Sequence, residues 1–355
     1  MKDFIEKFNN CLRMVAPGTP LREGLENILR AKTGALIVLA TTPEVMELVE
    51  GGFNLDSEYS PSALYELAKM DGAIVLSANG KKIVKANAQL IPSSTMQSSE
   101  TGIRHRTAER VAKQTGEMVI SISQRRNVIT LYLGVYKYLL RDLGVILNKA
   151  NQALQTLEKY KTVLDKAIEQ LNALEFQGIV TVFDVARAIQ RTEMVMRVSG
   201  EIEEYILELG CEGRLVSMQL EELVAGVENE GLLILQDYHA LDLEKAVNDI
   251  SESIKEWFNE EFLDLLNISR VLGYGTTLSV LDLLIPPRGY RLLQKIPRLP
   301  LPVIDNLVKT FGGLEKILTA SMEELDEVEG IGEVRARTIK DGLRRLREQT
   351  FLSGS

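Results

Sequence analysis

The segment Asp71–Ser77 reads DGAIVLS, and its apolar run decides the expected fold of the first third of the chain. Four consecutive apolar residues bounded by Gly72 and Ser77 are too short for a helix and are typical of a buried strand. A longer run of the same kind, GALIVLA, lies upstream at Gly34–Ala40. Buried strands of this type pack helices on their faces, so the two runs predict a mixed α/β domain with a central sheet.

Helix and strand signals alternate around these two runs. The pairs Thr19-Pro20 and Ser60-Pro61 place a capping hydroxyl before proline, which predicts helices that begin there. Asn79-Gly80 is a hairpin-type turn. Three further strand-like runs follow, and the last two predict a β-hairpin: Lys81–Ile91, Met118–Ser123 and Val128–Leu133. We therefore expect residues 1–140 to form the α/β domain.

The acid that opens the quoted segment is a candidate functional residue. Asp71 and Gly72 stand directly before a buried strand, where a carboxylate at a sheet edge often holds a metal ion or faces a ligand. The alternative is an ordinary helix C-terminus capped by Gly72. The dipeptide alone favours that alternative.

The richest cluster is TGIRHRTAER, from Thr101 to Arg110. Gly102 precedes an expected helix start near His105, where free backbone N–H groups attract anions. Arg104, Arg106 and Thr107 would add donors for phosphate. The alternative is an exposed basic helix start. At the expected hairpin tip, Ser123–Arg126 could bring one more arginine to the same anion.

An acid for a divalent cation together with arginines for phosphate indicates nucleotide chemistry. The chain contains no GxxxxGK[ST] loop, no GxGxxG fingerprint and no kinase signature. Only two cysteines and two histidines occur, which excludes a disulfide framework, a cysteine-based zinc site and a multi-histidine metal site, and fits a cytoplasmic protein. The residues point to nucleotidyl or phosphoryl transfer at an atypical site.

Residues 141–285 are expected to be helical, because no proline occurs from Ser93 to Ile285. A heptad-like apolar seam runs from Leu147 to Leu171, and Thr181 with Asp184 resembles a capping box that opens a second long helix toward Leu209. The seam could belong to a helical bundle within the chain or to a spine that packs against copies of itself. The pattern does not distinguish the two.

Residues 286–355 carry a different charge from the rest of the chain. They hold 12 Lys and Arg against 10 Asp and Glu, a net of +2, whereas the other residues sum to −11 and the whole chain to −9. The segment LDEVEGIGEVRARTIKDGL, Leu325–Leu343, resembles the helix–hairpin–helix motif of DNA repair proteins. Its glycines let backbone approach a phosphate, and the basic residues beyond add phosphate contacts. The alternative is a plain helical hairpin. The DNA-binding residues we expect are Gly330, Gly332, Arg335, Arg337 and Lys340.

MDGAIVLS together with GIRHRTAERVAKQTG closely resembles the diadenylate cyclase domain, in which DGA and RHR are the defining pair. A cyclase domain (1–140), a helical spine for oligomerisation (141–285) and a helix–hairpin–helix domain (286–355), in this order, resemble the bacterial DNA-integrity scanning family over essentially the whole chain. Membrane-bound relatives carry N-terminal transmembrane helices, and no such run occurs here.

The resemblance implies a reaction in which two ATP molecules condense to cyclic di-AMP and two pyrophosphates at facing active sites. It implies Mg²⁺ or Mn²⁺ on Asp71 and catalytic roles for Asp71, Arg104, His105 and Arg106. Ile103 stands where some members have Thr, so only its backbone role carries over, and Gln124 stands where some have Arg, which leaves Arg126. The implied ATP-binding residues are Gly72, Leu90, Ile103, Arg104, His105, Arg106, Thr107, Ser123 and Arg126.

The resemblance further implies a cytoplasmic, nucleoid-associated homo-octamer without membrane attachment. Branched or damaged DNA on the last domain would regulate the cyclase as part of DNA damage signalling and repair. Two other classes stay open from the residues alone. One is a structural DNA-binding protein whose first domain only senses nucleotide. The other is a nuclease or ligase accessory factor, against which the lack of a carboxylate cluster for a two-metal site counts.

Overall fold

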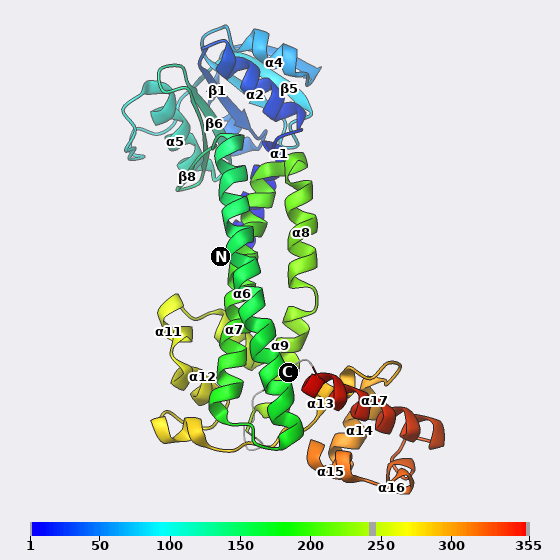
Figure 1. Ribbon diagram of the computed structural model, residues 1–355. Helices are drawn as coiled ribbons and strands as arrows, with labels where there is room; N and C mark the ends of the chain where they lie inside the picture. The colour runs from blue at the N-terminus through cyan, green and yellow to red at the C-terminus, as the bar shows by residue number, and fades with distance from the viewer. Residues whose placement is uncertain (1, 241–245, 353–355) are drawn as a thin grey trace. The chain divides into compact units, whose positions relative to one another are not determined.

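The computed structural model describes residues 2–240 and 246–352, and the chain divides into two compact units. The first unit is the chain up to Asn151 together with Glu203–Ser217. The second is Gln152–Ile202 together with the chain from Met218 onward. Each unit is described separately below (Figure 1).

A mixed sheet forms the centre of the first unit, as the apolar runs predict. Its order is β2-β5-β4-β1-β6-β7-β8, with β3 paired to β5. β1 and β4 run parallel, whereas β6 runs antiparallel to β1. The strands are β1 (Ala35–Leu39), β2 (Val49–Glu50), β3 (Phe53–Glu58), β4 (Ala73–Leu76), β5 (Lys82–Leu90), β6 (Met118–Ser123), β7 (Val128–Leu133) and β8 (Tyr136–Leu139).

Alternation along β1 builds a core on both faces of this sheet. Ile37 and Leu39 pack with Leu25 of α2 and Leu64 of α4. Leu36 and Val38 pack on the other face, against α5. The predicted caps are present, because Thr19 accepts from the N–H of Arg22 and Ser60 from that of Ala63. The helices are α1 (Lys2–Met14), α2 (Pro20–Arg30), α3 (Pro43–Met46), α4 (Pro61–Leu67) and α5 (Ile103–Thr115).

Two long helices follow, α6 (Leu143–Gln177) and α7 (Val182–Leu209). The expected capping box opens α7, where the Thr181 hydroxyl donates to Asp184 over 2.6 Å. The α6 seam is buried within the single chain, since Ala150 and Leu157 are 0% exposed and Leu171 is 1% exposed. Of the two arrangements that the sequence allows for this seam, packing against other helices of the same chain is therefore present.

The remaining elements are short helices. Glycine turns connect several of them, as the sequence of the last 70 residues predicts. None of the helices within the two described ranges has both the length and the apolarity needed to cross a bilayer. The elements are η1 (Gly210–Gly213), α8 (Arg214–Val224), α9 (Val227–Tyr238), α10 (Val247–Lys255), α11 (Asn259–Leu263), α12 (Leu265–Val271), η2 (Leu278–Asp282), α13 (Tyr290–Gln294), α14 (Leu301–Phe311), α15 (Leu314–Thr319), α16 (Met322–Asp326) and α17 (Glu333–Leu352).

Candidate functional sites

One edge of the sheet gathers the polar segments that the sequence singles out. β1 and β4 are parallel, so both begin at this edge, and Asp71 lies just before β4. β6 is antiparallel to β1 and pairs Ile122 with Ala35, which brings the end of β6 to the same edge. The turn between β6 and β7 therefore lies beside the start of β1, at the same edge as the start of β4.

Helix α5 begins at this edge as well. Gly102 is its N-cap residue and has extended backbone, with no side chain to cap the first N–H groups. His105, Ala108 and Ala112 are buried on the sheet side of the helix. This spacing fixes the rotation of α5, so Arg104 is exposed at its first turn. The helix start therefore offers backbone N–H groups and a partial positive charge to an anion.

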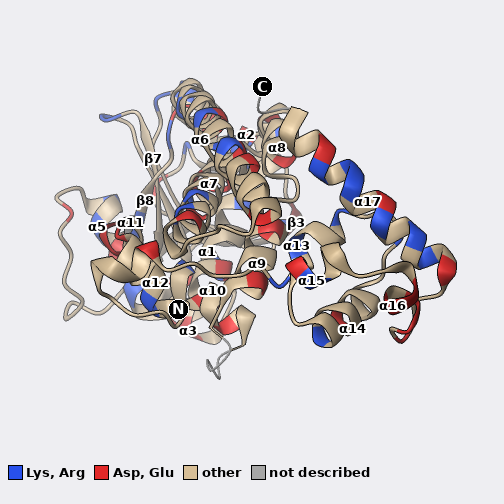
Figure 2. Cartoon of the chain, turned by 60° about the horizontal axis from the view of Figure 1, so that its bottom comes forward, with Lys and Arg blue, Asp and Glu red and all other residues tan. Residues whose placement is uncertain are grey.

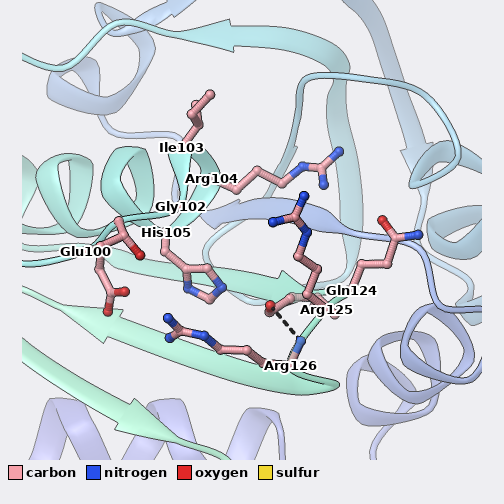
Figure 3. Close-up of a pocket in the computed structure, with 11 residues that line it drawn as sticks. Glu100, Gly102, Ile103, Arg104, His105, Gln124, Arg125 and Arg126 are labelled. Carbon is pink, nitrogen blue, oxygen red and sulfur yellow. Dashed lines mark hydrogen bonds between the residues drawn. The ribbon is translucent and has the colours of Figure 1, made fainter.

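A pocket of about 840 Å³ lies between the start of α5 and the β6–β7 turn (Figure 3). This volume falls within the range of small-molecule sites. Three arginines line it, namely Arg104, Arg125 and Arg126, and Glu100 is the one carboxylate among the described residues of its lining. The full lining is Glu100, Thr101, Gly102, Ile103, Arg104, His105, Ile122, Ser123, Gln124, Arg125 and Arg126. Its charge suits a polyanion such as a triphosphate.

Asp71 lies beside the pocket and is fully exposed. Its Oδ1 is 3.8 Å from Nη2 of Arg104. Gly72 has a φ of +91°, and a Cβ there would lie 2.8 Å from the carbonyl oxygen of Ala88. Only glycine fits this left-handed position against β5, so Gly72 sets the direction in which the chain presents Asp71.

The absence of a side chain at Gly34 leaves space for the Arg104 guanidinium. A Cβ on Gly34 would lie 2.3 Å from Nη1 of Arg104. We expect Gly34→Ala to displace the guanidinium while leaving the fold intact, because the clashing atoms are the far end of a flexible side chain. Nucleotide affinity should fall about tenfold, the cost of losing one charge-assisted hydrogen bond. Equilibrium dialysis with ATP measures it.

Gly200→Ala is the matched control for this variant, because nothing lies within 4 Å of a Cβ at Gly200 on α7. Unchanged ATP affinity in Gly34→Ala would show that Arg104 does not bind the nucleotide.

His105 is held by a buried chain of polar groups. Its Nδ1 lies 3.0 Å from the hydroxyl of Tyr132, which donates to Oε1 of Glu100 over 3.0 Å. Lys137 forms an ion pair with the same carboxylate. Lys137 is the cross-strand partner of Tyr132 on β8, which explains its reach. Burial opposes ionisation of Glu100, but hydrogen bonds from Lys137 and Tyr132 hold its pKa below the usual range.

Several predicted site residues lie outside the pocket lining. Arg106 bonds instead to the backbone carbonyls of Glu100 and Thr101, and so fastens the loop before α5. Leu90 is 8% exposed and packs in the core on the α5 face. The predicted residues that line the pocket are Ile103, Arg104, His105, Ser123 and Arg126, while Asp71, Gly72, Leu90, Arg106 and Thr107 do not.

Sequence reasoning did not select five residues that shape this site: Gly34, Glu100, Gln124, Arg125 and Tyr132. Gln124 and Arg125 belong to the predicted hairpin tip, so the whole tip could have been chosen. Tyr132 stands in an apolar strand run, VITLYL, and nothing in that run distinguishes it from a core residue.

The helix–hairpin–helix segment has the geometry that its sequence predicts. Gly330 lies between α16 and α17 with a φ of +83°, Ile331 is buried at 7% exposure, and Gly332 is exposed. The Asn306 side chain donates to the Glu329 carbonyl over 3.0 Å and so fastens the turn to α14. The turn therefore presents backbone ahead of a helix start, as phosphate contact requires.

Basic side chains are spread along α17 (Figure 2). Two of the predicted DNA-binding residues already contact the protein. Arg335 donates to the carbonyl of Gly330, and Lys340 donates to that of Leu318 over 3.1 Å. Arg337, Arg345 and Arg347 are exposed. These three are the better candidates for phosphate contact.

Comparison with known proteins matches the pocket domain, the helical region and the helix–hairpin–helix segment in the same order along the chain. Family models match at residues 22–135, described as "DisA bacterial checkpoint controller nucleotide-binding", at 140–281, described as the linker region of the same controller, and at 313–342, described as "Helix-hairpin-helix motif". The "DNA integrity scanning protein DisA" of Carboxydothermus hydrogenoformans is 64% identical over 99% of both chains. The chain belongs to the DisA family.

Other comparisons agree with the DisA assignment or add little to it. The DisA protein of Clostridium kluyveri is 60% identical over 98% of this chain and 97% of its own. A solved structure of DacA from Staphylococcus aureus is 22% identical, covers 38% of this chain and 90% of its own, and has a TM-score of 0.30. That score is too low to bear on the fold or the function.

Proposed function

We propose that this DisA-family chain is a diadenylate cyclase that condenses two ATP molecules to cyclic di-AMP and two pyrophosphates. The observation that carries the proposal is the arginine-lined pocket at the start of α5, with Asp71 exposed beside it. The nucleotide-binding family model covers all of these residues. A triphosphate needs several cationic donors at one place, and the pocket supplies them.

Each residue has a role that follows from its position. Arg104, Arg126 and the first N–H groups of α5, at Ile103 and beyond, bind the triphosphate and stabilise the departing pyrophosphate. Ser123 keeps the β6–β7 turn in shape, because its Oγ accepts from the N–H of Arg126 over 3.2 Å. Gly72 orients Asp71, and Arg106 holds the loop before α5.

Asp71 fits a divalent cation, either Mg²⁺ or Mn²⁺, that arrives with the nucleotide. Its carboxylate is exposed and lies 3.8 Å from the Arg104 guanidinium. No group of three or more His, Cys, Asp or Glu that could hold a metal ion occurs among the described residues. One carboxylate together with substrate phosphates is a usual magnesium ligand set. The bound cation supplies Lewis-acid stabilisation of phosphate charge.

The reaction needs two nucleotide sites, because each 3′-hydroxyl attacks the α-phosphorus of the other ATP. Each attack forms one phosphodiester bond and breaks the bond to the β-phosphate. The arginine-lined pocket at the start of α5 provides one of these sites. A second copy of the chain would supply the other, within the homo-octamer that the resemblance implies.

The last domain is proposed to bind branched DNA and to regulate the cyclase near the nucleoid. The support is the Gly330–Gly332 turn, the exposed arginines of α17 and the family match at residues 313–342.

The deciding experiment incubates the full chain with radiolabelled ATP and Mg²⁺ or Mn²⁺, with and without a four-way DNA junction. We expect a product that co-migrates with cyclic di-AMP, together with two pyrophosphates per product, at a rate that the junction changes. Binding of ATP with no product would indicate a nucleotide sensor instead, and a rate independent of the junction would overturn the regulatory part.

Arg337→Ala with Arg345→Ala is expected to weaken binding to the four-way junction and to lower the salt slope by about two, one for each phosphate that is no longer neutralised. Gel shifts across a salt series measure both. Lys166→Ala on α6 is the control, because it also removes an exposed positive charge. An unchanged slope in the double variant would place the DNA site elsewhere.

A further inference from the structure

Glu100, Tyr132 and His105 are buried, and together with the exposed Lys137 they form a chain of polar contacts that fixes where the hydrogens lie. Glu100 is ionised, because Lys137 pairs with it and hydrogen bonds hold the pKa of Glu100 below its usual range. The single hydroxyl hydrogen of Tyr132 therefore goes to Glu100. Toward His105 the hydroxyl oxygen can only accept, so Nδ1 of His105 carries a hydrogen.

The other ring nitrogen, Nε2, then holds a lone pair when the imidazole is uncharged. Nε2 is buried and has no hydrogen-bond partner in the described part of the chain. A buried polar atom without a partner is costly and calls for a ligand or a function. His105 lines the pocket among its arginines (Figure 3). An acceptor is the wrong group to face a phosphate oxygen, because both atoms carry lone pairs.

Several charged groups around His105 decide whether Nε2 can gain a proton. Burial, Arg126 on the β6–β7 turn and Lys137 on β8 lower its pKa, while Glu100 opposes them. Together these groups disfavour the charged imidazole. A bound triphosphate offsets the nearby positive charge, which removes much of the penalty against a second proton.

We propose that Glu100 and Tyr132 are positioning residues that hold His105 through Nδ1, so that Nε2 takes up a proton from solvent as the triphosphate binds and then donates to a phosphate oxygen. The inference rests on the proposed function and adds two residues to it. Glu100 stabilises the resulting imidazolium through the Tyr132 hydroxyl, which accepts from Nδ1 throughout.

The test uses 3′-deoxyATP with Mg²⁺, because this probe lacks the attacking hydroxyl and binds without turnover. Titration calorimetry at pH 7.5 in two buffers of different ionisation enthalpy gives the number of protons taken up. We expect net uptake of up to one proton per site in the wild type, and none in His105→Gln. The same titrations are run on Tyr132→Phe and on Tyr138→Phe.

Tyr132→Phe should abolish the uptake and weaken binding about tenfold, the loss expected for a hydrogen bond to a charged group. Tyr138→Phe is the matched control, because Tyr138 packs with the core on the opposite face of the sheet. Glu100→Gln keeps an acceptor for the hydroxyl but removes the charge, so it should reduce the uptake. Combined with Tyr132→Phe it should weaken binding no further. Thermal melts check that each variant is folded.

The outcomes separate the two proposals. A wild type that does not bind 3′-deoxyATP overturns the proposed function and this inference with it. A wild type that makes cyclic di-AMP but takes up no proton overturns the inference alone. Equal uptake in Tyr132→Phe and the wild type would also overturn it.

Discussion

Replacing Asp71 by Asn is expected to lower cyclic di-AMP synthesis by about 10²–10³-fold, the usual cost of losing one electrostatic partner of the transition state. The amide of asparagine is a poorer ligand for a hard divalent cation than a carboxylate. Stability should not change, because the Asp71 side chain is fully exposed and its contact with Arg104 spans 3.8 Å. Product formation from ATP and thermal melting together measure both effects.

Asp56→Asn is the control for this prediction. Asp56 is an exposed acid of the same unit, and it lies on strand β3, outside the pocket lining. Its carboxylate is 3.3 Å from Nζ of Lys82. It should keep its full activity. Turnover near the wild-type value in purified Asp71→Asn would show that the acid has only the turn-forming role that its sequence neighbourhood also permits.

The fold of the first unit could be predicted because its signals are local. The runs Gly34–Ala40 and Gly72–Ser77 became β1 and β4, and proline after Thr19 and Ser60 marked two helix starts. Strand order could not be predicted in the same way. It depends on which strands pair across the chain, as β1 does with both β4 and β6.

The same distinction between local and long-range signals decides which residues of the candidate site could be predicted. Arg104 and His105 were accessible to sequence reasoning because they belong to one contiguous motif at a helix start. Tyr132 was not, because its hydroxyl matters only through contacts with Glu100 and His105, which lie 32 and 27 residues away. The same motif predicts that Arg106 binds phosphate together with Arg104 and His105. The helical rotation instead turns its guanidinium to the loop carbonyls.

A different set of buried charges secures the second unit. Arg291 of α13 is 0% exposed and forms ion pairs with Glu175 of α6 and, over 2.7 Å, with Glu230 of α9. Tyr238 donates to Glu175 over 2.7 Å. Asp237 is 2% exposed and accepts the backbone N–H groups at the start of α13. Burial alone would lower the pKa of Arg291, but the carboxylates of Glu175 and Glu230 raise it overall.

Replacing Arg291 by Met is therefore expected to destabilise the chain by about 3–5 kcal/mol, because removing one member of a buried ion pair leaves the other buried and uncompensated. Urea unfolding measures the destabilisation, with Arg270→Met on the exposed side of α12 as the control. Adding Glu175→Gln should recover part of it, since the orphaned charge is then gone. A change below about 1 kcal/mol in Arg291→Met would mean that solvent reaches Glu175.

The same ion pairs decide which variants can test DNA binding. A chain cut after Pro286 lacks Arg291, the ion-pair partner of Glu175, and the N–H groups that Asp237 accepts, so a truncated protein would combine reduced stability with reduced DNA binding. Substitutions on α17 avoid that confusion, because Arg337 and Arg345 are exposed and lie outside this network.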